Sequence, residues 1–458
     1  MDRNSFTLTI EGRCYPTANS IDVINPANGR VFAQAPAAGL VEVEAAVDAA
    51  ARAQMLWARR DWADRASHLV RIAEVLEAHI DALAKIETAE QGKPLASARQ
   101  EIFQAALRCR DTAKMTLEPE VAETNEHHKV FVHHPPLGVV AAIIPWNFPV
   151  LLAFVKIAPA LLVGNTVVLK PAPSTPLTTL KICELLREIL PPGVLNVVSG
   201  DDALGPMITS HRSIDKITFT GSTATGKRVM ECAAKNLVGL TLELGGNDAG
   251  IVMPDVNVPA IAEALFWSAF NNSSQVCIAV KRMFVHTSIY DEVKAALIDV
   301  AGRMKMGDGT QEGVRLGPIQ NRPQYERVKT LIAETIAAGH RLALGGQVED
   351  GEGFFIPVTI FDNPPDDSRV VREEAFGPVL PLLRFDEIDE VVERANASEF
   401  GLGGAIWCAD EAMALDIASR LNTGTVWINE VQNINAAIPF FGTSSLWFGS
   451  RGRQGWFA

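Results

Sequence analysis

From Val130 onward, short β-branched runs alternate with helical segments, and this alternation constrains the fold more than any other feature. Apolar runs of strand length separated by helices are typical of parallel strands that helices cover on both faces. One such series extends to Met253 and a second begins at Lys281, with no internal repeat or low-complexity linker. The sequence therefore predicts an α/β fold with two parallel-sheet domains. The first series comprises strands over 139–144, 166–169, 195–198, 216–220 and 250–253 with helices over 177–188, 205–209 and 226–234, and the second comprises segments 281–286, 290–300, 325–338, 370–380, 388–396 and 404–407.

Two earlier stretches, 41–54 and 65–90, carry apolar residues at helical spacing and are predicted as helices. Gly92 is expected to end the second helix, and Pro94 prevents its resumption. The polar segment 117–134 then holds two adjacent histidine pairs. Adjacent strand residues point to opposite faces, which is poor geometry for shared metal ligation. A solvated hairpin is therefore favoured over a metal site, and no metal is expected.

Composition excludes several classes of protein. The chain has 458 residues, 48% apolar content and a net charge of −13. Apolar content this high is inconsistent with intrinsic disorder, and an acidic balance argues against a nucleic-acid partner, since phosphate binding needs a basic surface. Six cysteines without a Cys-x-x-Cys pair indicate reduced thiols rather than a disulfide scaffold. With no apolar leader at the first residues, a cytoplasmic location is predicted.

The uncharged stretch 135–155 is long enough for a membrane helix, but it holds four prolines and an asparagine. Prolines at this density break a helix, and unpaired backbone groups in lipid are costly. We therefore predict a buried strand, a turn and a helix, and no membrane association. The turn, Pro145-Trp146-Asn147-Phe148-Pro149, holds an amide on a rigid backbone. That amide could donate to an oxyanion, although a stiff structural turn would look the same.

Three further motifs could carry chemistry. The segment 219–226 places Gly221 and Gly226 around hydroxyl residues at a predicted helix N-terminus, where free N–H groups favour phosphate; a plain N-capped turn is equally consistent. Glu243 lies between leucines in a strand pattern, so burial would raise its pKa and suit it to general-base work, or it is a structural carboxylate. Cys277 stands in a short apolar stretch, as a nucleophile or as an inert core residue. A thiol nucleophile, a general base, an oxyanion donor and an anion-binding site together indicate a single active site.

In this combination and order, the motifs make the chain similar to the NAD(P)-dependent aldehyde dehydrogenase superfamily, over nearly its whole length. The resemblance implies two Rossmann-like α/β domains, one cofactor-binding (1–116 and 137–245) and one catalytic (246–430), plus a β-hairpin oligomerisation element (117–136 with 431–458). The resemblance is specific because six motifs recur in the family's order. They are Pro145-Trp146-Asn147-Phe148-Pro149, Lys170-Pro171, Gly221-Ser222-Thr223, Leu242-Glu243-Leu244-Gly245-Gly246, Gln275-Val276-Cys277 and Glu374-Ala375-Phe376-Gly377-Pro378.

The resemblance implies a role for each matching residue. Cys277 would attack the aldehyde to form a thiohemiacetal, with the Asn147 amide and the Cys277 N–H holding the oxyanion. After hydride transfer, Glu243 would activate the water that hydrolyses the thioester, which argues against the CoA-acylating branch. The implied cofactor contacts are Trp146, Lys170, Ser174, Gly221, Ser222, Gly226, Glu374 and Phe376, and the implied substrate tunnel is formed by Phe148, Trp267 and Phe440.

Three positions depart from the family's pattern. Pro173 stands where many NAD-using relatives carry a Glu that grips the ribose hydroxyls, so NAD or NADP is expected, with NADP tolerated. Ser274 replaces a usual Gly before Gln-x-Cys. After Phe440 the usual small residues become large apolar ones, as in Trp447 and Phe448. An atypical, truncated tail is expected to weaken oligomerisation, leaving a homodimer or a weakened homotetramer.

The aldehyde substrate is expected to be an uncharged aliphatic or aromatic one, because no Arg or Lys stands out to bind a carboxylate. Two other functions stay open. A cysteine hydrolase would use Cys277 with a histidine, although no histidine motif points at it. A catalytically impaired or non-enzymatic scaffold would explain the altered tail.

Overall fold

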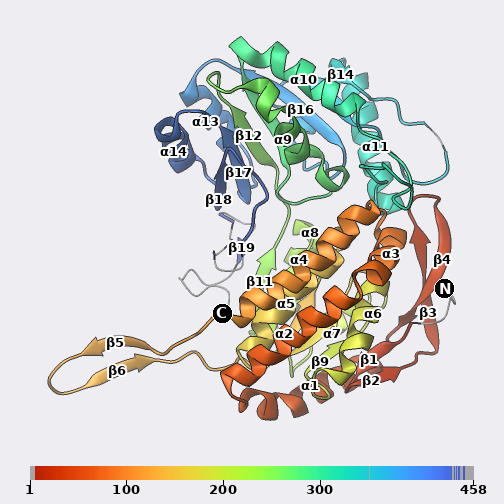
Figure 1. Cartoon of the computed structure of the whole chain (residues 1–458), viewed down its shortest axis with the longest axis vertical. Coiled ribbons are helices and arrows are strands. Elements are labelled where there is room, and N and C mark those ends of the chain that lie inside the picture. The colour runs from red at the N-terminus through yellow and green to blue at the C-terminus, as the bar shows by residue number, and fades with distance from the viewer. Residues whose placement is uncertain are drawn as a thin grey trace.

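The computed structural model describes residues 6–349, 351–435, 438, 440, 442–443 and 447–448. The chain forms two lobes, each built on a largely parallel sheet with helices packed against it (Figure 1). This arrangement confirms the predicted two-domain α/β fold. Figure 1 also shows a thin β-hairpin that extends away from the body of the molecule.

The sheet of the first lobe has the strand order β19-β11-β10-β7-β8-β9-β1-β2. Its central strands β7 to β11 are parallel, whereas β1, β2 and β19 pair antiparallel with their neighbours. Strands β7 and β8 are completely buried, which explains their continuous apolar sequences. The strands are β1 (Leu8–Ile10), β2 (Arg13–Tyr15), β7 (Val139–Ile143), β8 (Thr166–Lys170), β9 (Leu195–Val197), β10 (Lys216–Thr220), β11 (Gly239–Glu243) and β19 (Trp447–Phe448).

The helices of this lobe differ from the prediction in two places. The segment 65–90 forms two helices rather than one, because the backbone leaves the helical region at His79 (φ −116°, ψ 12°). A further helix, α4, follows Pro94 and was not predicted, although Ala98, Ile102 and Ala105 are buried at helical spacing. The elements are α1 (Leu40–Ala58), α2 (Trp62–Ala78), α3 (Ile80–Gln91), α4 (Leu95–Ala113), α5 (Pro149–Leu162), α6 (Leu177–Leu185), η1 (Leu186–Glu188), α7 (Leu204–Thr209) and α8 (Thr223–Ala234), with a peripheral hairpin of β3 (Asn19–Asn25) and β4 (Arg30–Ala37).

The sheet of the second lobe has the order β14-β15-β16-β13-β12-β17-β18 and is parallel except for β14. Successive residues of its strands enter different cores: Ile251 packs into one apolar cluster and Val252 into another on the opposite face. The elements are β12 (Asp248–Val252), α9 (Val258–Phe270), η2 (Asn271–Ser274), β13 (Val280–His286), η3 (Thr287–Ile289), α10 (Tyr290–Gly302), α11 (Arg322–Ala337), β14 (Leu342–Leu344), β15 (Thr359–Asp362), α12 (Arg369–Arg372), β16 (Val379–Phe385), α13 (Ile388–Asn396), β17 (Gly403–Trp407), α14 (Glu411–Arg420) and β18 (Thr425–Ile428).

The projecting hairpin consists of β5 (Glu120–Thr124) and β6 (Lys129–Val132), where the sequence predicts a solvated hairpin. Its apolar side chains, including Val121 and Phe131, are exposed. The tail predicted to be atypical is described at Trp447–Phe448, where β19 pairs with β11 of the same chain. Residues 441, 444–446 and 449–458 lie outside the described part.

The uncharged stretch 135–155 contains β7, a turn and the start of α5, as predicted. In the residues that the structure describes, no helix is both long and apolar enough to cross a membrane.

Candidate active site

Four functional candidates of the first lobe share one edge of its sheet. In the strand register, Ile143 of β7 aligns with Lys170 of β8 and with Phe219 of β10, and Thr220 aligns with Glu243. The carboxyl ends of parallel strands meet at the same edge, which is where ligands bind in open α/β sheets. The Asn147 turn, Lys170, the glycine loop at 221–226 and Glu243 therefore surround one area, which the second lobe covers.

The chain crosses between the lobes through Gly245 and Gly246, between β11 and β12. A side-chain carbon at Gly245 would collide with the Glu374 carboxylate, and one at Gly246 would lie 2.7 Å from the Cys277 carbonyl oxygen. The Gly246 contact is with backbone that cannot move aside, so glycine is required there for the lobes to approach, whereas at Gly245 a side chain would displace the Glu374 carboxylate. The crossing thereby brings Glu374 and Cys277 of the second lobe against Glu243 of the first.

Cys277 lies in the loop between η2 and β13, and its side chain keeps some accessible surface. Two hydrogen bonds fix the loop in front of it: the Ser273 hydroxyl donates to the Gly317 carbonyl (2.7 Å), and Gln320 N donates to Gln275 Oε1 (2.9 Å). Burial and the Glu243 charge raise the pKa of the Cys277 thiol well above its ordinary value. The free thiol is therefore protonated at neutral pH and needs a base nearby.

Ser274 shows why glycine is usual at its position. Asn272, Ser273 and Ser274 adopt φ values of 49°, 54° and 63°, in the left-handed region that side chains disfavour. The Ser274 side chain is buried, so its hydroxymethyl group stays inside the loop and does not face solvent. A serine instead of a glycine at position 274 therefore introduces backbone strain directly before the Cys277 segment.

Glu243 ends β11 with both carboxylate oxygens buried, and neither accepts an ordinary hydrogen bond from the described residues. Burial raises its pKa to about 7, against the opposing effects of the Lys156 charge and the neighbouring Cys277 thiol. Burial lowers the pKa of Lys156, on α5, to about 8. A carboxyl with a pKa near neutrality beside a thiol is a suitable general base.

Asn147 lies in the turn between β7 and α5. Its side-chain Nδ2 donates to the Gln275 carbonyl (2.9 Å), so the amide of one lobe is attached to the nucleophile loop of the other. Its own carbonyl accepts from Lys93 Nζ (3.0 Å) and from Asn272 Nδ2 (3.1 Å). The backbone of Asn147 is therefore held from both lobes, and its side-chain amide is held by the Gln275 carbonyl.

A buried charge cluster supports this turn and was missed by sequence reasoning. Lys93, which is 2% exposed, forms ion pairs with Glu101 and with Glu87 (3.1 Å). Glu101 also accepts from the N–H groups of Val150 and Leu151 (2.9 and 3.0 Å) at the start of α5. In the sequence, Lys93 was noted only as part of the segment that ends a helix. Its partners lie on two helices and a turn, so no local pattern in the sequence indicates the cluster.

The apolar candidates divide into two places. Phe148 and Phe440 pack in the same cluster as Cys277, together with the buried Trp427. Trp267 instead packs in the core of the second lobe, where its ring lies against Phe266. Of the three tunnel candidates, two therefore lie beside the thiol and one belongs to a different cluster.

The glycine loop fits a dinucleotide phosphate. The Ser222 hydroxyl caps α8 by accepting from Thr225 N (3.2 Å), and a side-chain carbon at Gly226 would lie 2.5 Å from Leu244. The missing side chain lets the N-terminal turn of α8 pack directly against the strand that leads to the lobe crossing. A helix N-terminus held at the carboxyl edge of the sheet suits pyrophosphate. Lys170 is buried at the same edge, and burial lowers its pKa.

The remaining cofactor candidates lie in the second lobe or touch it. Glu374 accepts from Gly246 N (3.2 Å), and Phe376 meets Trp146 edge to face with centroids 5.2 Å apart. Ser174 is engaged elsewhere, because its hydroxyl donates to Gln320 Oε1 (2.8 Å). Trp146, Glu374 and Phe376 are thus brought together, whereas Ser174 joins the lobes at a different point.

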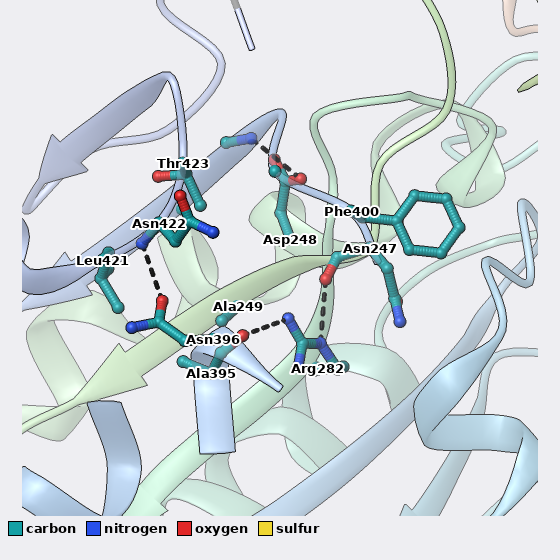
Figure 2. Close-up of a pocket in the computed structure, with 13 residues that line it drawn as sticks. Asn247, Asp248, Ala249, Arg282, Ala395, Asn396, Phe400, Leu421, Asn422 and Thr423 are labelled. Atoms are coloured by element: carbon teal, nitrogen blue, oxygen red, sulfur yellow. Dashed lines mark hydrogen bonds between the residues drawn. The ribbon is translucent and has the colours of Figure 1, made fainter. Parts of the chain in front are cut away.

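A small hollow lies next to the crossing, where Asn247 and Asp248 begin β12 (Figure 2). Arg282 is buried there and donates to the carbonyls of Asn247 (2.9 Å) and Ala395 (3.0 Å). Burial raises the pKa of Asp248 to about 7, and Gly403 N donates to it (3.1 Å). These contacts anchor the first strand of the second lobe behind the Cys277 loop.

Comparison with known proteins agrees with this geometry. The profile of the aldehyde dehydrogenase family matches residues 15–457. A probable aldehyde dehydrogenase of a Pseudomonas species is 43% identical over 433 residues, which cover 93% of this chain and 87% of that protein. The chain belongs to the aldehyde dehydrogenase family.

Other aldehyde dehydrogenases extend the comparison. Retinal dehydrogenase 2 of Mus musculus is 38% identical and is matched over 96% of this chain and 85% of its own. The structure of an aldehyde dehydrogenase from Bacillus cereus in complex with NAD+ superimposes with a TM-score of 0.95 at 34% identity, over 99% of this chain and 94% of that chain. The predicted family and the predicted class of enzyme are confirmed.

Proposed function

We propose that this aldehyde dehydrogenase oxidises an aldehyde to the carboxylic acid with NAD+ or NADP+, through a thioester on Cys277. The observation that carries this proposal is the placement of the Cys277 thiol beside Glu243, whose pKa burial raises to about 7, at the meeting of the two lobes. A protonated thiol and a carboxyl that ionises near neutrality are matched as nucleophile and base.

In the first half-reaction, Glu243 removes the thiol proton and the Cys277 sulfur bonds to the aldehyde carbon. The resulting oxyanion accepts from the Cys277 N–H and from Asn147 Nδ2, whose amide has a second N–H beyond the one donated to Gln275. When bound, the nicotinamide takes up the hydride that leaves this carbon. The oxyanion donors accelerate formation of the tetrahedral adduct, because negative charge develops on the oxygen as the sulfur bonds to the aldehyde carbon.

Before the second half-reaction, the Glu243 carboxyl releases the thiol proton to solvent. Glu243 then removes a proton from water, which attacks the thioester carbon. The adduct collapses to the acid, and the departing Cys277 sulfur takes the proton back from Glu243. Both oxygens of Glu243 are free of ordinary protein hydrogen bonds in the described part, so they can accept from water. Turnover should rise with pH through about 7, as the Glu243 carboxyl loses its proton.

The cofactor is proposed to lie on the N-terminus of α8, with Gly221, Ser222 and Gly226 at the pyrophosphate and Glu374 at a ribose. We expect NAD+ to be used and NADP+ tolerated, because Pro173 offers no carboxylate against a 2′-phosphate. Asp201 and Asp202 argue against binding of NADP+, because their carboxylates would repel a 2′-phosphate. Both lie near enough to Lys170 to raise its pKa. A preference for NAD+ above about a hundredfold, about 2.7 kcal/mol, would refute this part of the proposal.

The substrate is proposed to be an uncharged aliphatic or aromatic aldehyde. Phe148 and Phe440 pack beside Cys277, and burial of apolar surface favours such a substrate. Trp267 packs in another apolar cluster, so it supports the proposed apolar substrate less than Phe148 and Phe440 do. A marked preference for succinate semialdehyde over an uncharged aldehyde of equal length would contradict it.

We further propose that 1–116 with 137–245 forms the cofactor-binding domain and 246–430 the catalytic domain. The hairpin at 117–136 is proposed to serve oligomerisation together with 431–458, because its apolar side chains are exposed. Light scattering coupled to size exclusion tests the expected homodimer or weakened homotetramer, and a tight tetramer at nanomolar concentration would contradict the weakening.

The decisive experiment follows reduced cofactor by absorbance with a panel of aldehydes, for the wild type, Cys277→Ala and Glu243→Gln. We expect turnover by the wild type, no reduction by Cys277→Ala, and a burst without turnover by Glu243→Gln. A wild type that binds cofactor but oxidises no aldehyde would favour the scaffold hypothesis. Product formation that requires CoA would favour an acylating enzyme, and ester cleavage independent of cofactor would favour a cysteine hydrolase.

A further inference from the structure

Lys281 is a buried cation that no motif of the sequence singles out. It is the second residue of β13 and is 3% exposed. Its ammonium group donates to the carbonyl oxygens of Val276 (2.7 Å) and Cys277 (2.8 Å). The same group lies 3.5 Å from Glu374 Oε1 and 5.8 Å from the centroid of the Phe376 ring. One ammonium thus contacts both the nucleophile loop and the residues expected to hold the cofactor.

The two carbonyl contacts determine how the backbone runs past the thiol. The peptide groups of Val276 and Cys277 direct their oxygens at Lys281, and Ala279 N closes a turn onto the Val276 carbonyl (3.2 Å). Without the ammonium, the Val276 carbonyl would keep Ala279 N as a donor, whereas the Cys277 carbonyl would lose the donor described here. A buried carbonyl without a donor costs about 1–3 kcal/mol, so the orientation of the Cys277 peptide depends on the ammonium. Lys281 therefore contributes to the placement of the Cys277 side chain relative to Glu243.

The charges that face the thiol come from four elements. Glu243 at the end of β11, Glu374 after α12 and Asp248 at the start of β12 each raise the pKa of Cys277, whereas Lys281 on β13 lowers it. Lys281 also lowers the pKa of Glu374 and of Asp248. Its positive charge therefore acts on the thiol and on both carboxyls at once, and its effect on each group depends on the distance to that group.

We propose that Lys281 is a positioning residue that couples the cofactor-binding carboxylate Glu374 to the reactivity of the Cys277 thiol. This inference rests on the proposed function, because Glu374 is assigned to the cofactor ribose there. Hydroxyl donors that occupy the Glu374 carboxylate weaken its hold on the ammonium. The ammonium is then free to move closer to the Cys277 loop, where its field at the sulfur is stronger, so a bound cofactor promotes the thiolate before any aldehyde arrives.

The test measures alkylation of Cys277 by iodoacetamide against pH, by peptide mass spectrometry of the full chain, with and without NAD+ and with no aldehyde present. We expect Lys281→Met to alkylate about tenfold more slowly at pH 8 than the wild type, which is a rise of about one pH unit in the midpoint. Lys281→Arg keeps the charge and should keep the wild-type midpoint. NAD+ should lower the midpoint of the wild type and leave that of Lys281→Met unchanged.

The chain provides its own controls. Cys14 is exposed and reports the intrinsic rate of alkylation, whereas Cys109 is buried and reports unfolding. If Lys281→Met exposes Cys109, Glu374→Gln takes its place: it should lower the midpoint without cofactor and abolish the effect of NAD+. An unchanged midpoint in Lys281→Met, or an equal NAD+ effect in the variants and the wild type, overturns the inference. Because no aldehyde is present, a failure of aldehyde oxidation alone leaves these outcomes readable.

Discussion

Each lobe uses a buried lysine to hold the backbone beside its own functional side chain, and the two lysines are compensated differently. In the first lobe, Lys93 donates to the Asn147 carbonyl and is paired with two carboxyls, Glu87 and Glu101. In the second, Lys281 donates to the Cys277 carbonyl and is paired with Glu374, which is 16% exposed. The proposed oxyanion donor is therefore supported by an ion-pair cluster that is buried, whereas the proposed nucleophile is supported by an ion pair whose carboxylate is partly exposed.

This difference indicates that the ion pairs around Lys93 have a structural role only, whereas the ion pair of Lys281 includes an expected cofactor contact. The partners of Lys93 are fully buried, and no substrate or cofactor role is assigned to them. The partner of Lys281 is an expected cofactor contact, so we expect this ion pair to change when the cofactor binds. We expect the first support to affect stability most and the second to affect reactivity most.

The largest effect should come from Lys93→Met. Removing the cation leaves Glu101 buried without a counter-charge, and breaking a buried pair in this way costs about 3–5 kcal/mol of unfolding free energy. Urea denaturation measures it, with Lys281→Met as the matched variant and Glu87→Gln as a control that keeps the volume. Equal losses for the two lysines would remove the distinction between the supports.

A somewhat smaller effect is expected on catalysis from Asn147→Ala. Loss of an oxyanion donor lowers kcat by about a hundredfold to a thousandfold, with little change in KM. Steady-state kinetics at saturating cofactor measures the change, and circular dichroism verifies the fold. A fall in affinity for aldehyde with kcat preserved would indicate that Asn147 binds the ground state instead.

The dependence of stability on pH compares the lobes through one carboxyl in each. Burial raises the pKa of Glu90, which accepts from Leu177 N and Thr178 N, and that of Asp248 to about 7. Since the folded state then binds the proton more tightly than the unfolded state, each group stabilises fully below about pH 4 and loses its contribution as pH rises to about 7. The loss amounts to at most about 3 kcal/mol for Glu90 and about 4 kcal/mol for Asp248.

Denaturation at pH 5 and pH 8 measures this loss in the wild type, Glu90→Gln and Asp248→Asn. Each substitution should reduce the difference between the two pH values. A variant that keeps the wild-type difference would show that its carboxyl ionises at an ordinary pH in the folded protein.

The smallest effect concerns the left-handed backbone in each lobe. Gly92 of the first lobe has φ 95°, whereas Ser274 of the second has φ 63° with a side chain. We expect Ser274→Gly to stabilise the protein by about 0.5–1 kcal/mol, because relief of strain outweighs the added freedom of the unfolded chain. Thermal denaturation would detect this as a higher Tm, and a lower Tm would show that the Ser274 hydroxyl contributes more than the strain costs.

Much of the fold could be predicted because parallel strands buried on both faces have continuous apolar sequences. The strand, turn and helix within 135–155 and the hairpin at 117–134 were predicted from prolines and polarity. Helix α4 was missed although its buried positions repeat at helical spacing. The break at His79 was missed because the periodicity of α2 and α3 is nearly continuous across it.

The candidate site was predictable where chemistry is carried by motifs, and less so where it depends on distant partners. Lys93 and Lys281 act through carbonyl groups, and a carbonyl acceptor leaves no signal in the sequence. Trp267 was assigned to the substrate tunnel by its residue type; on α9 it packs against the core of the second lobe, and its place in the tunnel stays a prediction. The sequence alone does not predict which way a helical side chain such as Trp267 points, because that depends on how α9 packs in the folded protein.

The two glycines of the lobe crossing determine which amino-acid substitutions the site can accept. The separation of the two lobes at this point is set by bare peptide groups, which have no rotamers and cannot repack. Substitutions elsewhere on either lobe can alter packing without changing this spacing. A single methyl group at Gly246, in contrast, would act as a wedge between Cys277 and Asp248. At Gly246 the spacing between the nucleophile loop and the first strand of the second lobe therefore leaves no room for any side chain.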